Sequence, residues 1–186
     1  PKGVINIVHG YGHKVGDALS RHPDVPIISF TGGTATGEKI AAVAAPMFKK
    51  LSPEMGGKNP NIIFEDADFD NAVKMSAKAA FSNQGQICLC GSRLFVQESI
   101  YDKFRTAVIQ ETQILKVGDP KDEKSNLGAV VSKPHMEKIL NCIDRAKEEG
   151  GEILTGGNRI ILEDNLKEGY YIEPTIIDGL TANCKT

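Results

Sequence analysis

Two side chains in this sequence have the chemistry of a nucleophile and of a general base. Cys88 follows a polar stretch at 83–86, and Glu54 lies close to two glycines. A thiolate is a strong nucleophile, and a helix N-terminus at Cys88 would stabilise it through unpaired N–H groups. A carboxylate in a flexible glycine-containing segment can swing into place and activate water. An inert buried thiol and a solvated loop glutamate are compatible with the same residues, so they alone leave the chemistry open.

A glycine-rich run at 31–37 could hold a nucleotide. It follows a predicted strand at 25–30 and precedes a predicted helix at 38–48. Such a loop presents backbone N–H groups to a phosphate or to the edge of a ring. A tight strand-to-helix turn uses the same glycines, so this motif by itself does not define a cofactor site.

Three motifs together resemble those of the aldehyde dehydrogenase superfamily. They are FTGGT at 30–34, EMGGKNP at 54–60 and NQGQIC at 83–88, in the family's order and at its spacing. The resemblance continues through SR at 92–93, GDP at 118–120 and GYYIEPT at 169–175, so it covers essentially the whole chain. The run ICLC at 87–90 is similar to the branch that oxidises 2-hydroxymuconic and 2-aminomuconic semialdehydes with NAD.

The resemblance implies a function and assigns residues to it. Cys88 would attack the aldehyde carbon, form a thiohemiacetal, and become a thioester after hydride transfer to NAD(P)+. Glu54 would activate the water that hydrolyses the thioester, and the backbone N–H of Cys88 would bind the oxyanion. The cofactor would be NAD, with NADP as the alternative, and would contact four residues of the first part of the chain: Gly32, Gly33, Gly37 and Met55. His135 or Lys138 would lie near its adenosine end.

The predicted elements belong to the α/β class. Strand, helix, strand, glycine loop and helix in succession are typical of a parallel sheet. Strands are predicted at 4–8, 25–30, 61–65, 94–96 and 152–155, with an edge strand at 170–177. Helices are predicted at 15–21, 38–48, 69–81, 100–115 and 133–149. We therefore expect the end of a nucleotide-binding parallel-sheet domain at 1–55, followed by most of a catalytic α/β domain at 56–186.

Composition and charge narrow the class of protein. The 186 residues carry a formal net charge of −2, which does not favour a nucleic-acid surface. The apolar runs are too short to span a bilayer, and the histidines and cysteines have no metal-site spacing. Four sparse cysteines indicate a reducing compartment, the cytoplasm or the mitochondrial matrix. The partner is expected to be a small aldehyde, and the parent protein a homodimer or homotetramer.

Three other interpretations of the same motifs remain. Both ends of the sequence look cut, which predicts a piece of a longer enzyme, and such a piece could be an inactive structural or interaction module. A related reductase would use the same thiol to return an acyl group to an aldehyde, but it would not need Glu54. A redox protein built on Cys88 and Cys90 would need a strained disulfide.

Overall fold

The chain forms two compact units in the computed structural model, which describes residues 1–185. The amino-terminal unit is Pro1–Gly57 and the carboxyl-terminal unit is Lys58–Thr186. Thr186, the last residue of the second predicted domain, lies outside the described residues. The roles given to the two domains, nucleotide binding and catalysis, remain predictions.

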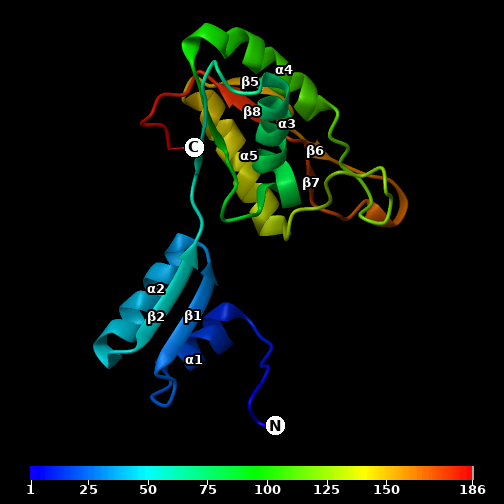
Figure 1. Ribbon diagram of the computed structural model, residues 1–186. Coiled ribbons are helices and arrows are strands. Elements are labelled where there is room, and N and C mark those ends of the chain that lie inside the picture. Colours follow the sequence, from blue (N-terminus) through cyan, green and yellow to red (C-terminus); the bar gives the residue numbers. More distant parts are fainter. Residues whose placement is uncertain (186) are drawn as a thin grey trace. The chain divides into compact units, whose positions relative to one another are not determined.

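The amino-terminal unit is built on a pair of parallel strands. It contains a π-helical turn, η1 (Gly12–Gly16), then α1 (Asp17–Arg21), β1 (Ile27–Gly32), α2 (Thr34–Ala44), a 3₁₀ turn, η2 (Ala45–Met47), and β2 (Lys50–Met55). The strands pair from Ile27 with Lys50 to Gly32 with Met55, and α2 lies along them (Figure 1). The helix predicted at 38–48 lies four residues earlier, at Thr34–Ala44, and gives way at Ala45 to η2, which contains Pro46.

One strand predicted for this unit is absent, and another is present but exposed. Residues 4–8 form no strand, and Val4 and Val8 are 69% and 63% exposed. A strand needs a neighbour for its N–H and C=O groups, and within residues 1–185 β1 pairs only with β2. The strand predicted at 25–30 exists as β1, but it is not buried, since Ile27 is 59% exposed.

The strand β2 was not predicted, because Pro53 and the charged residues around it argue against a strand. The structure shows why the proline is tolerated. The N–H of Lys50 donates to the carbonyl of Pro26 on the β1 side, at 2.9 Å. N–H direction alternates along a strand, so the nitrogen of Pro53, three residues on, faces away from β1 and interrupts no bond of the pair.

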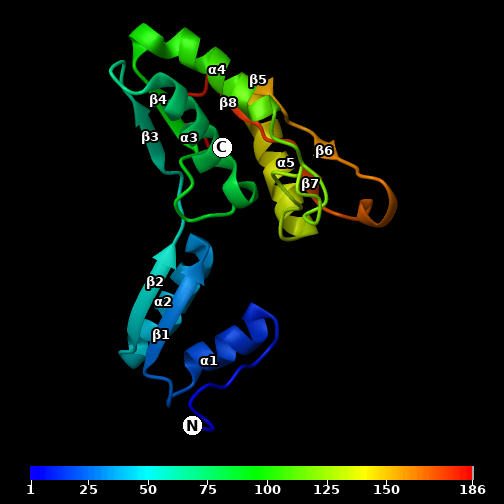
Figure 2. The ribbon, with the colours of Figure 1, turned by 45° about the vertical axis from the view of Figure 1, so that its right-hand side comes forward.

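The carboxyl-terminal unit combines one parallel and two antiparallel strand pairs with three helices (Figure 2). Its parallel pair is β3 (Pro60–Ile63) with β4 (Arg93–Val96), and its antiparallel pairs are β5 (Glu152–Thr155) with β8 (Ile176–Asp178) and β6 (Arg159–Ile160) with β7 (Tyr171–Ile172). The helices are α3 (Phe69–Phe81), α4 (Tyr101–Gln113) and α5 (Lys133–Glu148), and the 3₁₀ turns are η3 (Ser82–Gly85), η4 (Glu98–Ile100) and η5 (Asp164–Leu166). The single edge strand predicted at 170–177 is two strands, β7 and β8, with Pro174 between them.

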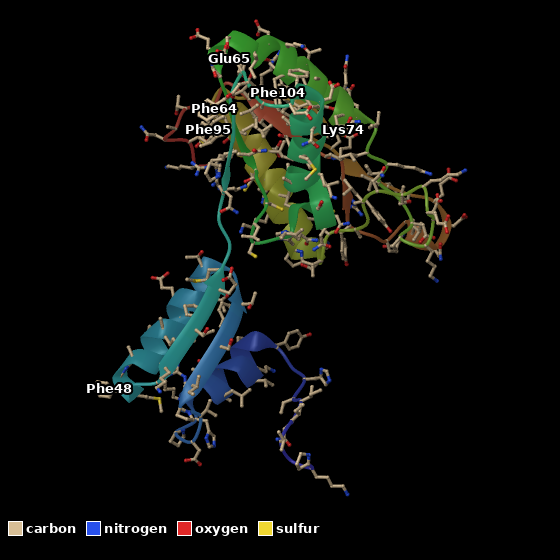
Figure 3. The ribbon with its side chains drawn as sticks, in the orientation of Figure 1. Phe48, Phe64, Glu65, Lys74, Phe95 and Phe104 are labelled. Atoms are coloured by element: carbon tan, nitrogen blue, oxygen red, sulfur yellow. The ribbon has the colours of Figure 1, made fainter. Side chains whose placement is uncertain are left out.

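The core of this unit lies where α3 and α4 meet the β3–β4 pair. Phe104 of α4 is 1% exposed and meets Phe69 of α3 edge to face, with ring centroids 5.9 Å apart. The buried cluster also contains Ile63, Val73 and Val108. Figure 3 labels Phe104, which belongs to this cluster. Burial of these side chains fixes α3, which ends beside the turn that carries Cys88. Within residues 1–185, no helix combines the length and apolarity needed to cross a bilayer.

Candidate functional site

Cys88 lies in a turn between two elements. The N–H of Cys90 donates to the carbonyl of Ile87 at 3.2 Å, which closes a four-residue turn, here called the cysteine turn (Ile87–Cys90). The 3₁₀ turn η3 precedes it and the strand β4 follows it. Among residues 1–185, Cys88 does not begin a helix, so the condition under which a helix N-terminus would stabilise its thiolate is not met.

The chain enters the cysteine turn through three left-handed residues. Asn83, Gln84 and Gly85 have φ values of 50°, 57° and 73°. A left-handed backbone at a residue other than glycine costs about 1–3 kcal/mol and persists where the surroundings enforce it. Here Gln86 supplies part of that enforcement, because its N–H donates to the carbonyl of Asn83 at 3.0 Å and its Oε1 accepts from the N–H of Val131 at 2.9 Å.

A side chain that sequence reasoning missed holds the cysteine turn from the other side. The Nδ2 group of Asn59 donates to the carbonyl oxygens of Cys88 at 2.7 Å and of Cys90 at 3.3 Å. Asn59 directly precedes β3, and its own carbonyl accepts from the N–H of Arg93 at the start of β4, at 3.2 Å. The turn is thereby tied to the parallel strand pair. Asn59 lies in the motif at 54–60, but only the tertiary structure brings it to Cys88.

The side chain of Cys88 is partly accessible, and its backbone N–H donates no hydrogen bond within residues 1–185. It is half-buried, whereas Cys90 is 5% exposed and belongs to the core, and no disulfide joins cysteines within residues 1–185. The backbone N–H of Cys88 has no acceptor among residues 1–185. A half-buried thiol beside a free N–H group can attack a carbonyl and receive the negative charge that develops on its oxygen.

Glu54 and Met55 lie on β2, in the amino-terminal unit. Glu54 is opposite Thr31 of β1, and its side chain is exposed. The expected flexible loop begins only after Met55, so Glu54 is anchored by strand pairing, and its mobility is that of the side chain alone. Met55 is opposite Gly32, and its sulfur packs against Gly37 of α2.

Three glycines are predicted to contact the cofactor, and the structure gives a different reason for the lack of a side chain at these positions. A Cβ at Gly32 would approach the ring of Phe30 to 2.6 Å, and a Cβ at Gly37 would overlap the sulfur of Met55, so packing within the unit accounts for both. A Cβ at Gly33 would meet nothing within 4 Å. Gly33 is the N-cap residue of α2, and no side chain caps this helix end. Its free N–H groups therefore suit the approach of an anionic or polar group.

A cavity of about 160 Å³ lies between α2 and the strand pair. Most of its lining is apolar, with Phe30, Ile40, Leu51 and Met55 among the residues around it. Such a lining suits side-chain packing and gives a phosphate few partners. The open N-terminus of α2 is the better candidate for polar contact with a cofactor.

His135 and Lys138 lie on α5 in the carboxyl-terminal unit. Burial, and to a smaller extent the charge of Lys138, lowers the pKa of His135 below its usual range. The N–H of His135 donates to the cap residue Ser132 at 3.4 Å. The contact of His135 or Lys138 with adenosine remains a prediction.

Comparison with known proteins decides the family. Residues 1–186 match the model of the aldehyde dehydrogenase family. The chain belongs to the aldehyde dehydrogenase family. It is 48% identical over 182 residues to 2-aminomuconic semialdehyde dehydrogenase of Mus musculus, an alignment that covers 97% of this chain and 37% of that enzyme. It is 46% identical to the peroxisomal aminoaldehyde dehydrogenase 1 of Pisum sativum, over 98% of this chain and 36% of that enzyme.

Solved structures share the fold of this chain. The structure of betaine aldehyde dehydrogenase from Staphylococcus aureus in complex with NAD+ superposes with a TM-score of 0.86 at 45% identity, covering 90% of this chain and 33% of that one. HpcC from Thermus thermophilus superposes with a TM-score of 0.89 at 36% identity, covering 92% and 34%. The predicted α/β class and the family resemblance are confirmed. The chain spans about a third of the length of the family members that it matches.

Proposed function

We propose that the protein containing this chain oxidises an aldehyde to a carboxylic acid, with Cys88 as the nucleophile. The Cys88 thiolate forms a C–S bond to the aldehyde carbon, which gives a thiohemiacetal. The free N–H of Cys88 donates to the oxygen as it becomes negatively charged. The half-buried thiol with this unpaired N–H, in a turn fixed by Asn59 and Gln86, is the observation that carries the proposal.

Glu54 completes the reaction in this proposal. Its carboxylate takes a proton from water, and the resulting hydroxide attacks the thioester carbon, which releases the acid and returns the thiolate to Cys88. The exposed position of the side chain at the end of β2 leaves it free to change rotamer. A reductase that returns acyl groups to aldehydes has no hydrolysis step, so Glu54 supports oxidation to the acid.

The amino-terminal unit is proposed to hold NAD, with NADP as the alternative. Gly33 leaves space beside the uncapped start of α2. Next to it lie the paired strand ends Gly32 and Met55, with Gly37 of α2 packed against Met55. These residues fit a ligand that brings polar groups to a helix N-terminus. When bound, the cofactor would supply the acceptor for the hydride that the thiohemiacetal on Cys88 loses, along with a proton, as it becomes the thioester. Relatives crystallised with NAD+ support this assignment.

The substrate is proposed to be a small semialdehyde. The 2-aminomuconic semialdehyde dehydrogenases of mouse and human are each 48% identical to this chain, which supports a muconic semialdehyde. A homodimer or homotetramer and a cytoplasmic location remain predictions for the whole protein.

Alkylation by iodoacetamide tests the nucleophile. Cys142 on α5 is half-buried like Cys88 and serves as the internal reference. We expect Cys88 to react about tenfold faster near neutral pH, by peptide mass spectrometry, because it is the proposed nucleophile in the cysteine turn and Cys142 lies outside that turn on α5. Saturating NAD+ should change the Cys88 rate and leave the Cys142 rate unchanged.

The same measurement addresses the alternative of an inactive module. Equal, slow rates at Cys88 and Cys142, unaffected by NAD+, would show that the motifs are present without a working site. A Cys88→Ala variant confirms that the fast-reacting peptide is correctly assigned.

A further inference from the structure

We propose that Asn59 is a positioning residue for the reaction, and that its side-chain amide aims the backbone N–H of Cys88 at the substrate oxygen. The inference rests on the proposed function, because it concerns how the nucleophile's turn is oriented. Asn59 touches neither the substrate nor the reacting atoms. It acts through the peptide group that follows Cys88 and through the carbonyl of Cys90 at the end of the turn.

The geometry fixes both flanking peptides. The peptide between Ile87 and Cys88 is held because the Ile87 carbonyl accepts from the N–H of Cys90 at 3.2 Å. The peptide between Cys88 and Leu89 is held because the Cys88 carbonyl accepts from Asn59 at 2.7 Å. Each peptide group is planar, so fixing one of its polar atoms restricts the whole plane.

Two consequences follow for Cys88. With both neighbouring planes restricted, its φ and ψ are restricted as well, and so is the direction of its Cα–Cβ bond. Its N–H lies trans to the Ile87 carbonyl, so the N–H points away from the side on which that carbonyl is bonded. The thiol and the free N–H therefore keep one mutual orientation, which is what an attack on a carbonyl requires.

Asn59 also determines where the turn lies. Its second bond, 3.3 Å to the carbonyl of Cys90, holds the far end of the cysteine turn. Its own carbonyl is bonded to the N–H of Arg93 across the parallel strand pair. The side-chain amide of Asn59 is thus attached to the β3–β4 pair, which forms part of the core of the carboxyl-terminal unit. Without the amide, the carbonyl of Cys88 would lose its partner and that of Cys90 would keep only the N–H of Ser92, at 2.9 Å, so the turn could rotate.

Asn61 lies two residues after Asn59, within β3, and provides a matched comparison. Its Nδ2 group donates to the hydroxyl of Ser76 in α3 at 2.9 Å, in a similarly half-buried setting. It ties β3 to α3 and makes no hydrogen bond to the cysteine turn. Removing the Asn61 amide therefore measures the loss of an asparagine hydrogen bond that does not hold the cysteine turn, for comparison with the loss of the Asn59 amide.

The test compares two electrophiles that make different demands on the site. p-Nitrophenyl acetate is attacked at its carbonyl carbon. A C–S bond forms, the bond to p-nitrophenolate breaks with its electron pair, and negative charge develops on the carbonyl oxygen in between. Iodoacetamide is attacked at a saturated carbon, where iodide leaves and no oxyanion develops. Only the first reaction needs the aimed N–H.

We expect Asn59→Ala to slow p-nitrophenolate release by about tenfold, which is less than the loss on removing an oxyanion donor outright. Alkylation of Cys88 should stay within about twofold of the wild-type rate. Asn59→Asp, of nearly the same size but with acceptors facing two carbonyls, should be at least as slow in acylation. Asn61→Ala and Asn61→Asp should leave both Cys88 rates within about twofold. All rates are taken per folded chain, measured by circular dichroism, and Asn59→Asp carries the test if Asn59→Ala does not fold.

Each outcome decides a different question. If the Asn59 variants slow both reactions by the same factor, or neither, the positioning role is wrong. Wild-type rates in Asn59→Asp would show that donation by the amide is not used. If wild-type p-nitrophenolate release persists in Cys88→Ala, or is absent from the start, the proposed function of Cys88 itself is wrong and the positioning role is lost with it.

Discussion

Gly32 and Gly33 are adjacent in the chain, but a different structural feature accounts for the glycine at each position. The side of Gly32 is occupied by the ring of Phe30, whereas the side of Gly33 is open. The sequence predicts both as cofactor residues, since a glycine shows only that a side chain is missing. The structure explains Gly32 by packing and leaves Gly33 as the position where a ligand can come close.

Alanine substitutions separate the two causes. Gly32→Ala should lower the free energy of unfolding by about 1–3 kcal/mol, because its methyl group displaces the Phe30 ring. Gly33→Ala should cost at most about 1 kcal/mol, the effect of a poorer N-cap residue, and should weaken NAD+ binding because the methyl group occupies the open side. Urea unfolding and isothermal titration with NAD+ measure the two effects. Unchanged NAD+ affinity in a folded Gly33→Ala protein would argue against the proposed cofactor position.

At the scale of elements, a polar clasp joins α4 to β8 and β5. Asp178 of β8 accepts from the hydroxyl of Tyr101 at 2.7 Å and from Nε of Arg105 at 3.0 Å. Arg105 also reaches Glu152 of β5 at 3.1 Å. The Tyr101 hydroxyl is the main cause that holds the pKa of Asp178 below its usual range, against the opposing effect of burial, with the N–H of Gly179 and Arg105 adding to the lowering. The same bond raises the pKa of Tyr101 above its usual range.

These shifts predict the pH dependence of stability. A lowered pKa at Asp178 adds stability above the unfolded pKa of about 4, which is lost as pH falls through the lower folded value. A raised pKa at Tyr101 adds stability below about pH 10, which is lost as pH rises through the higher folded value. Asp178→Asn should flatten both limbs of the melting temperature measured from pH 3 to 11, and at pH 7 it should cost about 1 kcal/mol for these partly exposed groups.

A surface aspartate serves as the control for the clasp. Asp144 makes only an ion pair with Lys147, one helical turn away on α5, at 3.1 Å. Asp144→Asn should leave the shape of the pH profile nearly unchanged. If it flattens the profile as much as Asp178→Asn does, the clasp is not the source of the pH dependence.

The elements also show which local signals suffice. The helix predicted at 69–81 has the observed bounds, because Asp68 caps it through the N–H of Asn71 at 3.3 Å and its apolar residues face one core. The strand β2 was missed, because nothing in its composition shows that the nitrogen of Pro53 faces away from its partner. Local signals are sufficient where an element carries its own cap and apolar face, and insufficient where a neighbouring strand decides.

At the scale of the molecule, the two units differ in buried apolar side chains. Ala44 is the buried hydrophobic residue of the amino-terminal unit among residues 1–57, whereas the carboxyl-terminal unit buries Phe104, Val108, Met136 and others. Phe48, labelled in Figure 3, directly follows η2 and is 93% exposed. Burial of apolar surface is the main stabilising contribution, so the units are expected to open with different free energies.

Hydrogen–deuterium exchange measures this difference. Amides of α2 and β1 should exchange faster than those of α3 and α4 in the same protein, followed by mass spectrometry of matched peptides. Saturating NAD+ should slow exchange in α2, because a ligand bound to the folded state stabilises it. Equal protection of α2 and α3 without NAD+ would contradict the assignment of stability to the apolar core.

The sequence by itself determined the family, the α/β class and the identity of the candidate nucleophile and base. These follow from residue types in a fixed order along the chain, which every member of a family must keep to place the same chemistry. Only the tertiary structure decided that residues 4–8 form no strand, that Cys88 lies in a turn and that Asn59 holds that turn. Each of these depends on which groups meet across the fold: an N–H without a strand partner, three left-handed residues, and an amide 29 positions away in the chain. Hydrogen-bond partners of this kind are set by packing, and packing is a property of the folded molecule.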